Sequence, residues 1–344
     1  MIGYYIHHHG RGHLSRALAI ARELGEPVTG LSSLSRPQDW PGDWLQLPLD
    51  ELAGESEPGA RTRAEHDAGG RLHWVPLGSP GLRGRMAAIA GWIDAHRPRA
   101  VVVDVSVEVC LLVRLHGVPV VAFVLPGHRD DPAHELGFDV ATTILAAWPP
   151  EATTGMVTGV PQRIAERIIA VGAISRFEPV GDSIVDARAA HVDQPRVLVM
   201  AGAGGEDFAA NAVSLARREA PGWHWTHLGG SGTWTADPWP HIVAADVVVT
   251  HAGQGAVAEV AAARRPAVII PQSRPHAEQQ ATGAILAGAA WPAIVTPAMP
   301  TSGWSDLLAR ARALDGAAWR AWNDGAGAAR AAREIRSTAE RAQR

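Results

Sequence analysis

The chain opens with Ile2-Gly-Tyr-Tyr-Ile6, continues through the loop His7-His-His-Gly-Arg-Gly12, and then repeats apolar residues every three or four positions up to Leu24. A short apolar run of this length is typical of a buried strand, and the spacing from Leu14 to Leu24 is that of one face of a helix. Gly25 ends the helical pattern. These residues therefore predict a strand, a polar glycine-containing loop and a helix.

The same unit recurs along the chain. Short strands that alternate with helices are typical of a parallel sheet covered by helices on both faces. Glycine-rich loops fall near residue 10 and again after residue 200, which predicts two doubly wound α/β domains joined by the stretch 172–194. We expect the first domain at 1–173 and the second at 174–344, with a surface excursion at 40–80 and a helical tail from about Ser305. The further apolar runs lie at 100–105, 118–125, 196–200, 246–249 and 267–270.

Composition excludes several classes of chemistry. All 31 basic residues are arginine, so a P-loop, a Schiff-base enzyme and a pyridoxal-phosphate enzyme, which need a lysine, are excluded. Cys110 is the only cysteine, which excludes an intrachain disulfide, a cysteine-rich zinc site and a cysteine-held iron–sulfur cluster. The net charge of -4 indicates neither nucleic acid nor an anionic membrane surface as a partner.

Two features bear on the location of the protein. The first residues have no basic start and no long apolar stretch, unlike a secretory signal peptide. No apolar run approaches the 18 residues of a membrane-spanning helix. We therefore expect a cytoplasmic protein without a transmembrane segment.

His13 stands at the helix N-terminus after the first predicted strand, and Asp104 ends the apolar residues 100–103 of another. The carboxyl ends of these strands meet at one edge of the sheet. A neutral imidazole at a helix N-terminus can act as a general base, and Asp104 could accept its second ring proton. The alternatives are a polar cap for His13 and a helix N-cap for Asp104. No carboxylate cluster lies close in sequence to His7-His-His9, so we expect no metal site.

The loop His251-Ala-Gly-Gln-Gly255 follows a strand of the second domain and opens a helix, where backbone N–H groups can bind a diphosphate. Gly253-Gln-Gly-Ala-Val-Ala258 also fits the dinucleotide pattern G-x-G-x-x-A. That pattern needs an acid after the next strand, and Pro271-Gln272 stand there instead. Glu259, one turn into the helix, could accept hydrogen bonds from ribose hydroxyls or could simply suit the helix dipole.

Glu278, Gln279 and Gln280 follow the next strand end and begin another helix. Their acid and amide groups can bind sugar hydroxyls. Such runs are also common in the first turn of ordinary helices. The combination with the preceding loop favours a sugar site.

Residues 246–284 resemble the donor-binding half of the glycosyltransferase-B superfamily, in the order strand, H-x-G-x-G, helix with a glutamate, strand, proline and H-x-x-Q-Q. They are most similar to the family containing the transferase that makes the peptidoglycan lipid intermediate. Gly10-Arg-Gly-His-Leu-Ser-Arg16 resembles that family's glycine–histidine loop, and is closer to the G-x-G-H-x-x-R of UDP-sugar hydrolases of nonulosonic acid synthesis. Val171-Gly-Ala-Ile-Ser-Arg176 resembles the linker that nears the diphosphate.

The resemblance implies two Rossmann-like domains facing a central cleft, the first binding the acceptor and the second the nucleotide sugar. It implies inverting transfer from a nucleoside-diphosphate sugar, UDP before others, to an unknown small-molecule or lipid-linked acceptor, with His13 as base. Helix dipoles and backbone amides, and neither a cofactor nor a metal, would stabilise the departing diphosphate. The last helix would return to the first domain. The implied donor site comprises Gly12, Arg176, Gly204, His251, Gly253, Gln254, Gly255, Glu259, Glu278, Gln279 and Gln280.

The sequence departs from the family pattern at two places. Arg264-Arg265 stand where a glycine often precedes the proline, and Gly283 stands where an asparagine is common. A nucleotide-sugar hydrolase, a non-catalytic nucleotide-sugar sensor and, more weakly, an epimerase are alternatives on the same scaffold. Tryptophans of the 40–80 stretch could stack on a sugar or an apolar acceptor, although we expect most tryptophans to pack in the core or on the surface. The three tryptophans of this stretch that could stack are Trp40, Trp44 and Trp74.

Overall fold

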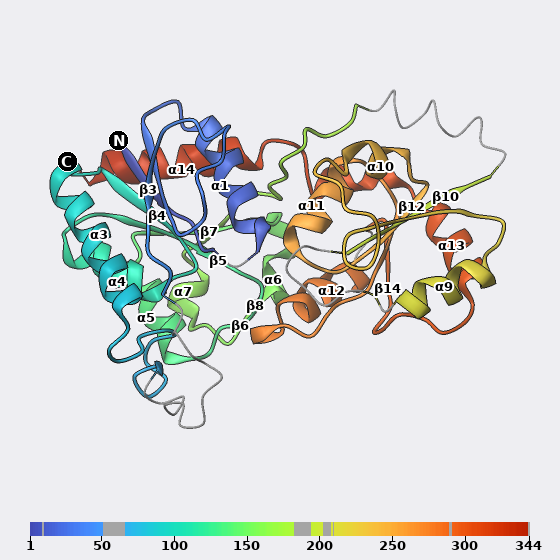
Figure 1. Cartoon of the computed structure of the whole chain (residues 1–344), viewed down its shortest axis with the longest axis horizontal. Helices are drawn as coiled ribbons and strands as arrows, with labels where there is room; N and C mark the ends of the chain where they lie inside the picture. The colour runs from blue at the N-terminus through green and yellow to red at the C-terminus, as the bar shows by residue number, and fades with distance from the viewer. Residues whose placement is uncertain are drawn as a thin grey trace.

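In the computed structural model the chain folds into two α/β domains, each built on one main sheet (Figure 1). The structure describes residues 1–8, 10–50, 66–181, 194–201, 208, 210–288 and 291–342. All strand pairs in the two main sheets are parallel. The prediction of two doubly wound α/β domains is confirmed. Over the described residues, no helix has both the length and the apolar character needed to cross a membrane.

The first domain contains a seven-stranded sheet. Its strands are β1 (Ile2–Tyr5), β2 (Val28–Ser32), β3 (Asp43–Gln46), β4 (Ala100–Asp104), β5 (Val120–Val124), β7 (Thr143–Ala146) and β9 (Ile168–Ala170). They lie in the order β3-β2-β1-β4-β5-β7-β9. The order reverses between β1 and β4, which is where ligands bind in such sheets.

The helices of the first domain include α1 (Arg11–Glu23), which follows β1, and α4 (Val107–Leu115), which follows β4. β4 and β5 are buried along their whole length, as expected for central strands covered on both faces. The remaining elements are α3 (Pro80–His96), α5 (Pro132–Val140), α6 (Thr153–Met156), α7 (Gln162–Ala165), the 3₁₀ helix η1 (Pro150–Ala152), and the small pair β6 (Gly127–His128) and β8 (Val157–Thr158).

Part of the stretch 40–80 is an edge strand, so the expected surface excursion is wrong for residues 40–47. β3 pairs in parallel with β2. Trp40 is 3% exposed, and its ring meets that of Trp44 edge-on at 5.2 Å. Gly30 of β2 leaves the room that the Trp44 ring occupies. The two indoles thus supply the apolar face that the glycines and prolines of this stretch lack.

The second domain contains a five-stranded sheet in the order β11-β10-β12-β13-β14, which reverses between β10 and β12. Its strands are β10 (Arg196–Met200), β11 (His224–Leu228), β12 (Val247–Thr250), β13 (Ala267–Ile269) and β14 (Ala293–Val295). Its helices are α9 (Ala210–Glu219), α10 (Trp239–Ala244), α11 (Gln254–Ala262), α12 (Glu278–Gly288) and α13 (Trp304–Arg312), with the short turns η2 (Pro275–Ala277) and η3 (Gly316–Ala321).

The chain passes between the domains twice, and the two passages touch. After β9 it leaves the first sheet through Gly172 and Ala173, and it returns into α14 (Gly327–Arg341), which packs on α1, β4 and β7 (Figure 1). The Ala173 N–H donates a hydrogen bond to the Trp322 carbonyl at 3.2 Å. A Cβ at Gly327 would collide with the carbonyl oxygen of Ala173. The predicted boundary after residue 173 falls at this contact and remains a prediction.

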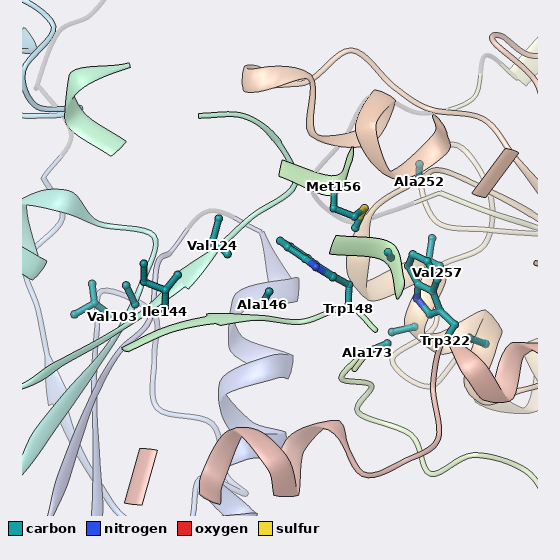
Figure 2. Packing of buried hydrophobic residues seen from close by; sticks show 14 of the residues in the cluster. Val103, Val124, Ile144, Ala146, Trp148, Met156, Ala173, Ala252, Val257 and Trp322 are labelled. Atoms are coloured by element: carbon teal, nitrogen blue, oxygen red, sulfur yellow. The ribbon is translucent and has the colours of Figure 1, made fainter. Parts of the chain in front are cut away.

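One apolar cluster draws residues from both domains (Figure 2). Trp148 and Met156 of the first domain belong to it, as do Val257 and Trp322 near the second. Trp148 is fully buried, and its indole N–H donates to the Thr153 hydroxyl at 3.2 Å. The two domains therefore share a continuous core.

Candidate functional site

A cleft of about 1170 Å³ lies between the two domains and is lined from both sides. The carboxyl ends of β1 and β4 open into it from the first domain, and the loop after β12 opens into it from the second. Most of the predicted site residues line it. These are Gly12, His13, Arg176, His251, Gly253, Gln254, Gly255, Glu259, Glu278 and Gln279.

His13 and Asp104 are in contact, as their places after β1 and at the end of β4 predicted. The Nδ1 atom of His13 lies 3.1 Å from Oδ2 of Asp104. Arg16, one turn further along α1, donates from Nη2 to Oδ1 of the same carboxylate. Arg16 Nη2 is also 3.3 Å from His13 Nδ1, but the carboxylate is the stronger partner for a ring proton. We assign that proton to Nδ1, which leaves the lone pair on Nε2.

Asp104 is ionised at neutral pH. It is fully buried, and burial raises its pKa, but the charges of Arg16 and His13 outweigh this and lower the pKa to about 2. Asp104 does not cap the next helix, because Ser106 accepts from the Val109 N–H at that position. The carboxylate is therefore committed to His13 and Arg16.

The N-terminus of α11 forms the opposite wall. Its N-cap is Gly253, which has no side-chain oxygen to occupy the first amides, and Gly253 and Gly255 both border open space. The positive end of the helix dipole there favours an anion. Nη1 of Arg16 reaches across to Oε1 of Gln254 at 3.3 Å. One guanidinium thus connects the His13–Asp104 pair to the anion-binding helix end.

Two predicted donor residues hold the loops in place. His251 is 5% exposed, its Nδ1 lies 3.0 Å from the Ile270 carbonyl, and its ring stacks on Phe208 at 4.0 Å. Gln279 Oε1 accepts from the backbone N–H groups of Ala252, at 3.1 Å, and Gln272, at 2.9 Å. Gln279 therefore ties the loop after β12 to the loop after β13 and keeps only its NH₂ group for a ligand.

Arg176 and Glu259 form an ion pair at the cleft. Arg176 Nε donates to Glu259 Oε1 at 2.8 Å. Burial raises the pKa of Glu259 above its ordinary value, and Arg176 opposes that rise. The pair joins the linker after β9 to the second turn of α11.

Of the predicted residues at the start of α12, Glu278 lines the cleft and Gln280 does not. Glu278 faces the cleft and accepts a hydrogen bond from Arg129 Nη2 of the first domain at 2.7 Å. Gln280 is exposed, its amide donates to the Gln272 carbonyl at 3.0 Å, and it does not line the cleft. Gly204 lies outside the described residues.

Sequence reasoning missed Arg16 and Arg129 as site residues. Arg16 stands three positions after His13, so the helical period puts both side chains on one face of α1, and this signal could have found it. Arg129 is 3% exposed and follows the two-residue strand β6, a place that no motif marks.

The two departures from the family pattern have structural explanations. Arg264 has a φ of 54°, the left-handed conformation that a glycine adopts most easily after a helix. Its guanidinium donates to the carbonyls of Ala261 and Asn323, each at 2.7 Å. A Cβ at Gly283 would lie 2.5 Å from Cγ of Pro271, so this position has no room for a side chain.

Comparison with known proteins bears on this geometry. Residues 237–291 match the glycosyltransferase family 28 C-terminal domain. No curated protein matches the chain. Among solved structures, the chain is similar to the glycosyltransferase of kitacinnamycin (16% identity, 98% of each chain, TM-score 0.64) and to MurG of Acinetobacter baumannii (17% identity, 98% of this chain and 99% of that one, TM-score 0.64). It is also similar to UGT89C1 of Arabidopsis thaliana complexed with UDP (14% identity, 99% and 98%, TM-score 0.59).

The chain has the glycosyltransferase-B fold. The matched domain contains β12 and the loop after it, α11, β13 and the whole of α12, which build much of the second wall of the cleft. Residues 237–291 are thus similar to a domain of glycosyltransferases, and the whole chain has the fold of glycosyltransferases. The superfamily inferred from the two sequence loops is confirmed.

Proposed function

We propose that this protein is a glycosyltransferase that transfers a sugar from a UDP-sugar to an acceptor hydroxyl, inverts the anomeric carbon, and uses His13 as general base. The observation that carries the proposal is the His13–Asp104–Arg16 group, which faces the N-terminus of α11 across one cleft. The solved relative complexed with UDP supports the choice of nucleotide.

The chemistry follows from the assigned protons. Nε2 of His13 takes the proton of the acceptor hydroxyl while that oxygen attacks the anomeric carbon. The bond between this carbon and the β-phosphate oxygen breaks, and the diphosphate leaves with the bonding electrons. Asp104 stabilises the imidazolium that forms, and the amides at the N-terminus of α11 stabilise the diphosphate. This sequence of steps uses neither a cofactor nor a metal.

Different side chains of the cleft would bind the ribose and the sugar of the donor. Glu259, held by Arg176, would accept hydrogen bonds from the ribose hydroxyls. Glu278, held by Arg129, and the NH₂ group of Gln279 would bind the sugar hydroxyls. Gln280 is assigned no role in donor binding, because its side-chain amide donates to the Gln272 carbonyl and does not line the cleft.

The experiment begins with thermal shifts in the presence of UDP, GDP and dTDP, free and as sugar conjugates. A ligand at 100 times its dissociation constant stabilises a protein by about 2.7 kcal/mol, which moves the melting temperature visibly. We expect UDP and its conjugates to raise it most. Release of the nucleoside diphosphate is then measured with a panel of acceptors. No shift with any nucleotide would contradict the proposed donor site.

The His13→Ala variant tests the base. We expect turnover to fall by roughly 10²- to 10⁴-fold, because the general base is removed, while the dissociation constant for UDP stays unchanged. His241→Ala, which removes an exposed imidazole from α10, is the matched control and should keep full turnover. Unchanged turnover in His13→Ala would overturn the assignment.

A hydrolase on the same scaffold is the second candidate, because Arg16 of the G-x-G-H-x-x-R segment belongs to the site. In that case water takes the place of the acceptor on His13. Diphosphate release in water alone, at the rate seen with acceptors, would select the hydrolase. Tight UDP-sugar binding with no release under any condition would instead indicate a sensor.

A further inference from the structure

Three imidazoles and one carboxylate form a second cluster at the cleft, and all three imidazoles line it together with His13. His73 precedes α3, Asp131 is the N-cap of α5, His134 lies in the first turn of α5, and His276 comes from η2 of the second domain. His73 Nε2 lies 3.3 Å from Asp131 Oδ1, and His134 Nδ1 lies 2.5 Å from Oδ2. His276 Nδ1 is 3.9 Å from Oδ2.

We propose that His73, Asp131 and His134 bind a divalent transition metal ion, Zn²⁺ foremost, with His276 as the fourth ligand. One ligand atom from each of the first three residues lies within 4.8 Å of the others. Tetrahedral Zn²⁺ has bonds of about 2.0–2.2 Å, which separate its ligand atoms by about 3.4 Å. The three imidazole nitrogens lie 2.5, 3.3 and 3.9 Å from the carboxylate oxygens of Asp131, on both sides of this value, so side-chain rotations can bring each imidazole to the required distance from the carboxylate.

The donor set selects the class of ion. Three imidazole nitrogens and one carboxylate oxygen suit Zn²⁺, Co²⁺ or Ni²⁺, whereas Mg²⁺ and Ca²⁺ prefer oxygen ligands alone. The side chains of His73, Asp131 and His276 are each about one-third exposed, which leaves a route for the ion from solvent. The site is thus accessible and contains the ligands that the chemistry needs.

Arg129 is the charge that opposes the ion. Its Nη1 donates to His134 Nε2 at 3.0 Å, and a metal on Nδ1 moves the remaining ring proton to Nε2, so this hydrogen bond is lost. The bonds of Arg129 to the Pro126 carbonyl, at 2.8 Å, and to Glu278, at 2.7 Å, remain. We therefore expect weaker binding than in a closed structural zinc site.

The backbone brings the second domain up to the cluster. Gly127 has a φ of 106°, and a Cβ there would collide with the carbonyl oxygen of His276. His276 and Ala277 have φ values of 58° and 53°, a strained conformation for residues with side chains. A metal held by residues of both domains would fix η2 against the first domain. The inference does not depend on the proposed sugar transfer.

The test uses full-length, tag-free protein stripped with a chelator. Equilibrium dialysis against Zn²⁺, followed by metal analysis, should give one ion per chain, and Co²⁺ should give the intense visible absorption of four-coordinate cobalt. His73→Ala and Asp131→Asn should each weaken binding by at least about 10- to 100-fold, because the loss of a residue that only hydrogen-bonds a metal ligand already has an effect of that size. Asparagine caps a helix as well as aspartate does, so α5 is preserved.

The matched control is His224→Ala, which removes an exposed imidazole from the start of β11 and should bind as the wild type does. Melting temperatures without metal establish that each variant is folded, and His73, which lies outside any helix, provides the variant least coupled to folding. Equal Zn²⁺ affinity in wild type, His73→Ala and Asp131→Asn would overturn the proposal. So would the weak absorption of six-coordinate Co²⁺ in the wild type.

Discussion

Arg16 joins three functional groups through a single guanidinium. It donates to Asp104, lies next to His13, and reaches Gln254 of the second domain, and its Cζ lies 4.8 Å from the centre of the Phe123 ring. At 7% exposure it is almost completely desolvated, so its charge and that of Asp104 depend on each other.

Replacing Arg16 by methionine should destabilise the protein strongly. The change leaves the fully buried Asp104 carboxylate without its main counter-charge, which typically costs about 3–5 kcal/mol. Urea unfolding at pH 7 measures the free energy of unfolding. Arg22→Met on the same helix is the control, because its ion pair with Asp39 is about half exposed and should contribute about 0–1 kcal/mol. Equal losses in the two variants would contradict the buried pairing.

Asp104 should give the protein a pH-dependent stability in acid. Its pKa is lowered from 3.8 to about 2, so its stabilising effect is complete above pH 4 and is lost as the pH falls toward 2. In Asp104→Asn this part of the acid dependence should be absent. The free energy of unfolding of the wild type and of Asp104→Asn is measured between pH 5 and pH 2. The same pH dependence in both proteins would contradict the assigned pairing.

At the level of single residues, the sequence predicted the His13–Asp104 contact because both residues follow strands whose ends meet at one edge. It could not predict the cluster of His73, Asp131 and His134. Those residues come from a loop before α3 and from α5, and no short motif or helical spacing connects His73 to the other two. Only the packed domain brings them within bonding distance.

Among the elements, the N-terminus of α11 has the clearest consequence for function. Gly255 borders open space in the cleft, so alanine fits the fold there and fills the room into which a diphosphate would come. We expect Gly255→Ala to keep its stability, or to gain up to about 1 kcal/mol. UDP affinity should fall roughly tenfold to a hundredfold, the loss of one charge-assisted hydrogen bond. Isothermal titration and thermal unfolding measure the two quantities.

Gly91→Ala in α3 is the matched control for this prediction. Gly91 is exposed, lies inside a helix and also borders open space, but it does not line the cleft. It should gain stability without any change in UDP affinity. Unchanged affinity in Gly255→Ala would move the diphosphate away from α11.

The central strands of both sheets could be predicted because they are continuous apolar runs, such as residues 100–103 of β4. The edge strand β3 could not be predicted. Its sequence Asp-Trp-Leu-Gln lies among prolines and glycines, and its pairing depends on Trp44 packing over Gly30 of β2, fourteen residues earlier in the chain. A pattern of neighbouring residues cannot reveal a contact between two separate strands.

For the molecule as a whole, the shared apolar core should make the domains unfold together. Trp148 is fully buried in the cluster that both domains supply. We expect one calorimetric transition for the wild type. Trp148→Ala should lower stability by about 3–5 kcal/mol, because it leaves a large cavity, and should divide the transition in two. Trp304→Ala, in a cluster confined to the second domain, is the control. Two transitions in the wild type would disprove the coupling.

The contact of the two interdomain passages, Gly172–Ala173 against Gly327, has a consequence for how such chains diversify. A domain whose first and last residues touch can be exchanged by recombination as one unit. The two points at which it is inserted into the other domain then stay close together, whichever domain is inserted. The second domain, which contains α11, is therefore expected to be transplantable between distant relatives of this fold. Helix α14 would stay with the receiving first domain, because it packs on α1, β4 and β7. Shuffling at these two points offers a direct route to chimeras with new donor preference.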